Sequence, residues 1–138
     1  MLDHVYLPVT DVSRSRVFYR EVLGTLGIEE GFAREDSVVF GMGSPGALWI
    51  YPVTGRHDVE DDTCGMSPSI IGSMPTLHLA FRAAERAQVR EFFAVAESAG
   101  AETIEEPRLF TTYHPTYFAT FVRDPDGHNL EAVCNSPS

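Results

Sequence analysis

The chain carries one strand and helix plan twice, with His78 standing 74 positions after its counterpart His4. Residues 3–27 and 77–101 each begin with alternating residues and continue with apolar residues at helical spacing. Few positions are identical between the two copies, so their similarity lies in the shared hydrophobic pattern. A duplicated unit with a histidine at the same point of its first strand predicts a site built around a pseudo-twofold axis.

Each copy contains one predicted amphipathic helix. An acidic residue stands where each helix begins, Asp11 in the first copy and Glu85 in the second, and an acidic N-cap suits that position. Glycines follow the last apolar residues, with Gly27 in the first copy and Gly100 in the second. The predicted buried faces consist of Val12, Tyr19, Val22, Leu23 and Leu26, and of Val89, Phe92, Phe93 and Ala96.

Three short strand-like runs follow each predicted helix. They lie near residues 28–33, 37–40 and 47–53 in the first copy and near 102–104, 117–123 and 129–134 in the second. Turn-forming residues join the last two runs of each copy, at 43–46 and 124–127. The sequence therefore predicts an α+β fold of two βαβββ modules that form a concave, partly open mixed-sheet cavity. We expect a single domain over residues 1–138, with modules at 1–53 and 76–138.

Charge and composition exclude several classes of partner. A net charge of -10 and a pI of about 4.8 argue against nucleic acid, whose binding depends on cationic contacts to phosphates. No stretch reaches the roughly 20 apolar residues of a membrane span, and no basic and apolar leader is evident. Cys64 and Cys134 show no paired-spacing motif, so free thiols are expected. We therefore expect a cytoplasmic protein without a membrane or nucleic-acid partner.

Residues 54–75 join the two predicted modules and show no clear period. A connection of this length is either a tether or a lid over a site. Its potential metal ligands are His57, Asp58, Glu60, Asp61, Asp62 and Cys64. A solvated acidic linker is the favoured interpretation, because loops without periodicity rarely hold ligands rigidly.

Strand alternation separates the polar residues of the predicted strands from the faces that pack on the helices. In the first strand it puts His4 and Tyr6 on the face that points away from the helix. In the repeated strand it puts His78 and Arg82 on that face, and in the last strand Glu131. If these faces form one cavity, His4, His78 and Glu131 converge.

Two imidazoles and one carboxylate leave adjacent positions open on a six-coordinate metal ion. That ligand set suits ferrous iron and also admits manganese, zinc or nickel. The sequence therefore predicts a divalent metal ion (Fe, Mn, Zn or Ni) that is held by His4, His78 and Glu131 and binds a small-molecule substrate. The alternative is three unrelated hydrogen-bonded polar residues.

The first module has no obvious counterpart of Glu131. Aligning the apolar faces of the last strands of the two modules puts Trp49 at that position, and an alignment with a different gap puts Tyr51 there. Neither side chain is a usual ligand for these metals, so we expect three protein ligands. Trp49 and Tyr51, with Tyr6 and Arg82 on the same faces, are predicted to line the substrate pocket.

The duplicated plan, the opening residues 2–5 (LDHV) and the closing residues 121–133 (FVRDPDGHNLEAV) resemble the vicinal oxygen chelate superfamily. This family includes glyoxalase I, extradiol dioxygenases and the bleomycin and fosfomycin resistance proteins. The resemblance covers nearly the whole chain except 54–75, and implies that His4, His78 and Glu131 match the family's metal ligands.

The family's members differ at these positions. Two histidines and one glutamate resemble the extradiol dioxygenases, which usually have longer chains, and the fosfomycin thiol transferases. Glyoxalase I usually adds a glutamate where this chain has Trp49 or Tyr51. Because two-module members are commonly homodimers, the resemblance also implies a homodimer.

Residues 111–117 lengthen the second module at the rim of the predicted cavity. Pro115 biases His114 toward an extended conformation, and flanking aromatic residues are expected to shield its ring from water. We predict that His114 acts as a general acid or base, or as a hydrogen-bond donor, with Tyr113 or Tyr117 orienting the substrate. A surface histidine is an equally compatible interpretation, and we also assign it to His57 and His128.

Two functions therefore compete. The first is a metal-dependent enzyme of the family, which could be a dioxygenase, a lyase or isomerase, or a thiol transferase, acting on a small molecule that chelates the metal through adjacent oxygens. The second is a metal-free binding protein that sequesters its ligand in a dimer groove. The predicted lining of that groove is Trp49, Tyr51, Phe118 and Phe121.

Overall fold

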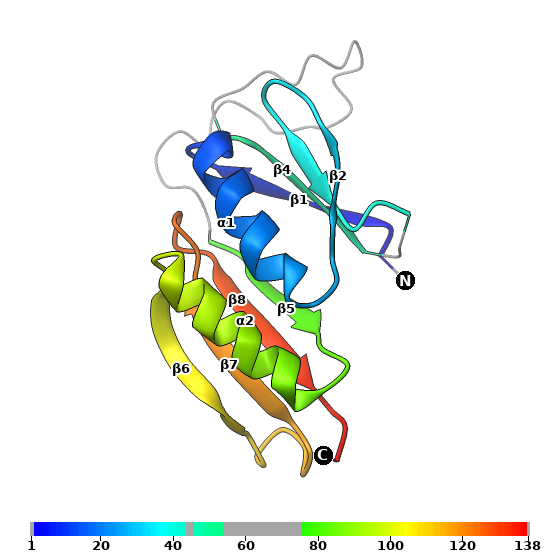
Figure 1. Cartoon of the computed structure of the whole chain (residues 1–138), viewed down its shortest axis with the longest axis vertical. Helices are drawn as coiled ribbons and strands as arrows, with labels where there is room; N and C mark the ends of the chain where they lie inside the picture. The colour runs from blue at the N-terminus through cyan, green and yellow to red at the C-terminus, as the bar shows by residue number, and fades with distance from the viewer. Residues whose placement is uncertain (1, 44–45, 54–75, 138) are drawn as a thin grey trace.

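The computed structural model describes residues 2–43, 46–53 and 76–137, which form two helices and two four-stranded sheets (Figure 1). The first module contains β1 (His4–Val9), α1 (Val12–Gly24), β2 (Glu30–Ala33), β3 (Val38–Phe40) and β4 (Ala47–Pro52). The second contains β5 (His78–Arg82), α2 (Arg86–Ser98), β6 (Glu102–Leu109), β7 (Phe118–Arg123) and β8 (Asn129–Cys134). The predicted linker at 54–75, with its candidate ligands, lies outside the described residues.

The two modules share one topology. The first sheet has the strand order β1-β4-β3-β2, and the second has the equivalent order β5-β8-β7-β6. In each sheet the first and last strands of the module pair in parallel, whereas the remaining pairs are antiparallel. Both sheets are open. The predicted α+β fold of two βαβββ modules is therefore confirmed.

Strand register shows which residues of the modules are equivalent. Tyr6 lies opposite Trp49 in the β1–β4 pair, and Ala80 lies opposite Glu131 in the β5–β8 pair. Tyr6 and Ala80 each follow the histidine of their strand by two residues. Trp49 is therefore the counterpart of Glu131, whereas Tyr51 lies two residues further along, opposite Pro8.

The helix ends follow from local chemistry. The Asp11 carboxylate accepts a hydrogen bond from the Arg14 backbone N–H at 2.9 Å and caps α1, as the sequence predicts. Glu85 stands at the corresponding position of α2 but makes no side-chain cap. Gly27 and Gly100 both adopt a positive φ, of 73° and 87°, which lets the chain leave each helix without the steric cost of a side chain.

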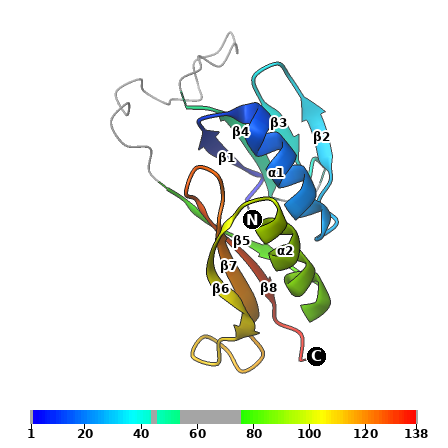
Figure 2. The same cartoon turned by 60° about the vertical axis from the view of Figure 1, so that its left-hand side comes forward.

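Each helix covers one face of its own sheet, and the two helices lie side by side (Figures 1 and 2). The apolar strand residues that alternation places toward the helices are in the core or pack against it. Those that are fully buried are Leu7, Val9, Leu130, Ala132 and Cys134. The faces that carry His4, His78 and Glu131 are therefore the opposite faces, as predicted from alternation. Within the described part of the chain, no helix is long and apolar enough to cross a membrane.

Strand β6 is longer than its sequence predicts, because it continues past residue 104 to Leu109. The additional residues contain Pro107 and do not alternate regularly in polarity. Pairing with β7 nevertheless extends the strand, since Arg108 lies opposite Ala119 and Leu109 opposite Phe118, with register shifts on the way. Tertiary pairing here outweighs local pattern.

His128 is buried, so its prediction as a surface residue is wrong. Its Nε2 lies 2.8 Å from the carbonyl oxygen of Pro8 in β1. Its Nδ1 accepts a hydrogen bond from the Leu77 backbone N–H at 3.1 Å. Because the Leu77 N–H donates to Nδ1, the proton that is donated to Pro8 is on Nε2. One histidine ring thereby joins the first module to the start of β5.

The turn that contains His128, residues 124–128, has further links to the first module through Asp124 and Asp126. The Tyr19 hydroxyl donates to the Asp124 carboxylate at 2.7 Å, and the pKa of Tyr19 is raised well above its usual value by burial and by this carboxylate. Asp126 accepts hydrogen bonds from the backbone N–H and the hydroxyl of Thr10, at 3.1 and 2.5 Å. We refer to residues 124–128 as the inter-module turn.

Candidate functional site

The candidate site is centred on a histidine and a glutamate from the paired strands β5 and β8. His78 Nε2 lies 3.0 Å from Glu131 Oε2. The Glu131 side chain is 5% exposed, whereas that of His78 is 49% exposed. A buried carboxylate requires hydrogen-bond partners or a cation, and His78 supplies one such partner on the open side of the sheet.

Tyr117 hydrogen-bonds to the other oxygen of the Glu131 carboxylate. Its hydroxyl donates to Glu131 Oε1 at 2.5 Å, so both oxygens of Glu131 are engaged. Burial, together with the hydrogen bond and charge of Glu131, raises the pKa of Tyr117 to about 12. Tyr117 therefore stays protonated and donates at neutral pH.

Aromatic rings continue from this site toward the predicted insertion. Phe121 lies opposite Glu131 in the β7–β8 pair, and its ring centroid is 5.9 Å from that of His78. Phe110 packs edge-on against Phe121 at 5.2 Å, and Tyr113 stacks on Phe110 at 6.1 Å. The Tyr113 ring also lies 5.3 Å from that of Tyr117. The site thus has an apolar wall on one side.

The flanking aromatic residues do not shield His114, contrary to the sequence expectation. The residue is exposed, and its Nδ1 lies 3.0 Å from the Thr116 hydroxyl oxygen. Tyr113, which is 68% exposed, stacks on Phe110 instead. The catalytic role of His114 stays a prediction.

His4 belongs to the other sheet. Its Nδ1 lies 2.6 Å from the Asp3 carboxylate, and its ring packs edge-on against Tyr6 at 5.2 Å. Among residues 2–43, 46–53 and 76–137, no three His, Cys, Asp or Glu side chains are grouped so that they could hold a metal ion. The structure therefore brings together two of the three predicted ligands, His78 and Glu131, within one chain.

Three predicted pocket residues gather on the face of the first sheet that carries His4. The Tyr6 ring centroid lies 6.0 Å from that of Trp49 and 5.7 Å from that of Tyr51. Arg82, the fourth, is an exposed residue at the end of β5 in the second module. The first module thus has an aromatic surface, and the second carries the polar pair of His78 and Glu131.

Asn129 is a site residue that sequence reasoning did not select. It lies opposite His78 in the strand register, and alternation puts its side chain on the same face as Glu131. Its side-chain oxygen is buried and has no hydrogen-bond partner. An unpaired buried oxygen beside an imidazole and a carboxylate suits a cation or a donor group of a ligand. The sequence signal for Asn129 was its place two residues before Glu131 in an alternating strand, which puts both side chains on one face.

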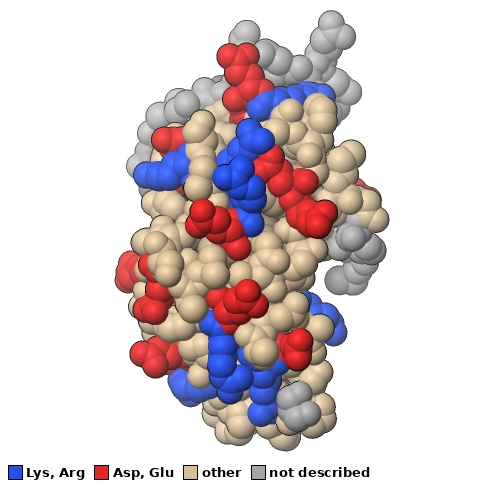
Figure 3. Space-filling model, viewed as in Figure 1, with Lys and Arg blue, Asp and Glu red and all other residues tan. Residues whose placement is uncertain are grey.

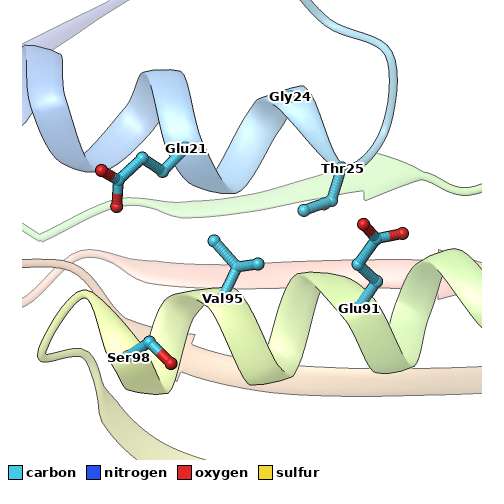
Figure 4. A pocket seen from close by; sticks show the side chains of 6 residues that line it. All are labelled: Glu21, Gly24, Thr25, Glu91, Val95 and Ser98. Carbon is cyan, nitrogen blue, oxygen red and sulfur yellow. The ribbon is translucent and has the colours of Figure 1, made fainter.

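A separate cleft of about 500 Å³ lies between the two helices (Figure 4). It is lined by Glu21, Gly24, Thr25, Glu91, Val95 and Ser98. These residues belong to the helix side of the molecule, where acidic and basic side chains are interspersed (Figure 3). The cleft is thus distinct from the sheet face that carries His78 and Glu131, and it contains no histidine, cysteine or tyrosine.

Comparisons with known proteins agree with this architecture. Residues 1–132 match the family model of the Glyoxalase/Bleomycin resistance protein/Dioxygenase superfamily. A glyoxalase/bleomycin resistance protein from Albidiferax ferrireducens T118 is 28% identical, with a TM-score of 0.75 over 97% of this chain and 98% of that chain. No curated protein sequence matches the chain.

Two more distant solved structures share the fold. Lactoylglutathione lyase from Agrobacterium tumefaciens is 19% identical, with a TM-score of 0.70 over 97% of this chain and 92% of that chain. TioX from Micromonospora sp. ML1 is 16% identical, with a TM-score of 0.69 over 99% of both chains. The chain belongs to the Glyoxalase/Bleomycin resistance protein/Dioxygenase superfamily, as its sequence resemblance implies.

Proposed function

We propose that the protein is a metal-dependent enzyme of this superfamily that acts on a small molecule with two adjacent oxygen donors. The observation that carries the proposal is the contact between His78 Nε2 and Glu131 Oε2 at 3.0 Å, on an open sheet face. An imidazole and a carboxylate at this separation are ligands that Fe²⁺, Mn²⁺, Zn²⁺ and Ni²⁺ all accept.

The residues around this pair fit a bound cation. The Glu131 carboxylate is buried, and the side-chain oxygen of Asn129 is buried without a partner. When bound, the metal ion would act as a Lewis acid on the substrate oxygens. The chain itself supplies the apolar wall of Phe121 and Phe110, which excludes water on one side, and Tyr117, which fixes the carboxylate.

We infer that the third ligand, His4, comes from a second copy of the chain. Two features support this inference. His4 stands on β1 in the other sheet, where it contacts Asp3, and His78 is half exposed on its own sheet face. A homodimer that joins the first module of one copy to the second module of the other would complete a site of two histidines and one glutamate. It would also bring the Tyr6 and Trp49 surface opposite the polar pair.

Metal titration of the purified protein tests the proposal. We expect close to one Zn²⁺ or Mn²⁺ per chain in isothermal titration calorimetry. His78→Ala and Glu131→Gln should each weaken metal affinity by more than the roughly 10 to 100-fold loss that is typical when a residue that hydrogen-bonds to a metal ligand is replaced. His114→Ala, an exposed histidine of the same module, is the matched control and should bind metal as the wild type does. Unchanged binding by both ligand variants would contradict the proposal.

A metal-free binding protein is the second candidate. The aromatic surface of Tyr6, Trp49 and Tyr51 favours it, because such rings bind planar or apolar ligands without a metal ion. The chain has one tryptophan, so the fluorescence of Trp49 reports directly on that surface. Ligand-dependent quenching that persists after chelator treatment and in Glu131→Gln would favour this candidate over the enzyme.

A further inference from the structure

Glu131 is held from two sides by different kinds of donor. Oε2 faces the His78 ring at 3.0 Å, and Oε1 accepts the Tyr117 hydroxyl at 2.5 Å. The carboxylate has two oxygens, and a hydrogen bond to one of them limits the way in which that oxygen can bind a cation. The geometry thus distinguishes the two oxygens of a single side chain.

Tyr117 is itself held in place by neighbouring backbone and ring contacts. Its backbone N–H donates to the His114 carbonyl at 3.1 Å, and its carbonyl accepts from the Phe110 N–H at 2.8 Å. Its ring packs edge-on against Tyr113 at 5.3 Å. The phenol is therefore presented to Glu131 by a fixed segment and needs no rearrangement to donate.

We propose that Tyr117 is a positioning residue that leaves Oε2 of Glu131 as the metal-binding oxygen, so that the site selects transition-metal ions against Ca²⁺. This inference rests on the proposed metal site. Calcium binds 6 to 8 oxygen ligands and often takes both oxygens of a carboxylate. A site with imidazoles and one carboxylate oxygen offers too few oxygens for Ca²⁺, whereas it suits Zn²⁺, Mn²⁺ or Ni²⁺.

The inference changes the role predicted for Tyr117. The sequence suggested that Tyr117 orients the substrate, but its hydroxyl proton is committed to Glu131. Tyr113, whose ring packs on that of Tyr117 and is largely exposed, makes no such bond to Glu131. The pair therefore provides a variant and a matched control on neighbouring rings.

Calorimetric titration of Zn²⁺ and, separately, of Ca²⁺ into the wild type, Tyr117→Phe and Tyr113→Phe tests the inference. Tyr117→Phe should lose about 10 to 100-fold in Zn²⁺ affinity, while its preference for Zn²⁺ over Ca²⁺ falls. Tyr113→Phe should keep both affinities. The inference would be overturned if Tyr117→Phe bound Zn²⁺ and Ca²⁺ each with the affinity of the wild type. If Glu131→Gln lost metal binding in the same experiment, the proposed function would still stand.

Infrared spectra of the wild-type protein provide a second readout that does not depend on the folding of a variant. The difference spectrum between metal-free and Zn²⁺-loaded protein gives the frequency separation of the antisymmetric and symmetric carboxylate stretches. This separation distinguishes coordination through one carboxylate oxygen from coordination through both. One-oxygen coordination is the expected result, and two-oxygen coordination would overturn the inference. No Zn²⁺ binding by the wild type would contradict the proposed function and this inference together.

Discussion

His128 Nε2 donates a hydrogen bond to the carbonyl oxygen of Pro8 at 2.8 Å, across 120 positions of sequence. Its other nitrogen accepts from the Leu77 N–H, directly before His78. A fully buried ring therefore connects β1 of the first module with the strand that carries one predicted metal ligand. The orientation of the two modules and the position of His78 depend on the same side chain.

Replacement of His128 by alanine should lower the free energy of unfolding by about 2 to 4 kcal/mol, because it removes two hydrogen bonds and leaves a cavity. Urea unfolding followed by circular dichroism measures the change. The matched control is His114→Ala, an exposed histidine, which should stay within about 0.5 kcal/mol of the wild type. Equal stabilities of the two variants would contradict the structural role of His128.

Tyr19 and Asp124 should be energetically coupled across the modules. Their hydrogen bond is 2.7 Å long and buried, and hydrogen bonds to charged groups contribute about 1.5 to 3 kcal/mol. A double-mutant cycle with Tyr19→Phe and Asp124→Asn should therefore give a coupling energy above about 1 kcal/mol. Additivity within about 0.3 kcal/mol would show that the contact contributes little to module packing.

Alkaline titration should detect Tyr117. Its pKa is raised to about 12 in the folded protein, so it keeps its proton above the ordinary range near 10. The stability that this difference provides is present below pH of about 10 and is lost as the pH rises from about 10 to 12. Ultraviolet absorbance of tyrosinate measures the ionisation among the five tyrosines.

Two variants assign the titration to its residue. Tyr117→Phe should remove one late-ionising tyrosine, whereas Glu131→Gln should shift that tyrosine to lower pH because it removes the neighbouring charge. Tyr113→Phe should leave both late-ionising tyrosines, Tyr117 and Tyr19, in place. Tyr19 should still ionise late in Tyr117→Phe, so an unchanged number of late-ionising tyrosines in that variant would contradict the assignment.

The sequence predicted the order of elements and the faces of the strands, because both depend on local periodicity. Leu7 and Leu130 are buried toward the helices as expected, and Trp49 stands in the register position predicted for the counterpart of Glu131. The duplication supports each assignment, since an element in one module predicts its counterpart in the other.

Contacts between the modules could not be predicted in this way. The partner of His128 is a backbone carbonyl in β1, and no periodic pattern points to it. The alternation rule placed His4 and His78 on open faces but gave no information on how the two sheets are arranged. The hydrogen bond from Tyr117 to Glu131 was not predicted either, because it depends on the pairing of β7 with β8.

We propose that His78 and Glu131 of one chain form a metal site with His4 of another. His4→Ala and Glu131→Gln should each lose high-affinity Zn²⁺ binding when pure. In a mixture of the two variants, exchanged dimers would contain one complete site, formed by His78 and Glu131 of the first variant and His4 of the second. Bound zinc per chain, measured by elemental analysis after subunit exchange and desalting, should therefore rise above that of either pure variant. Zinc content in the mixture equal to that of the pure variants would contradict the shared site.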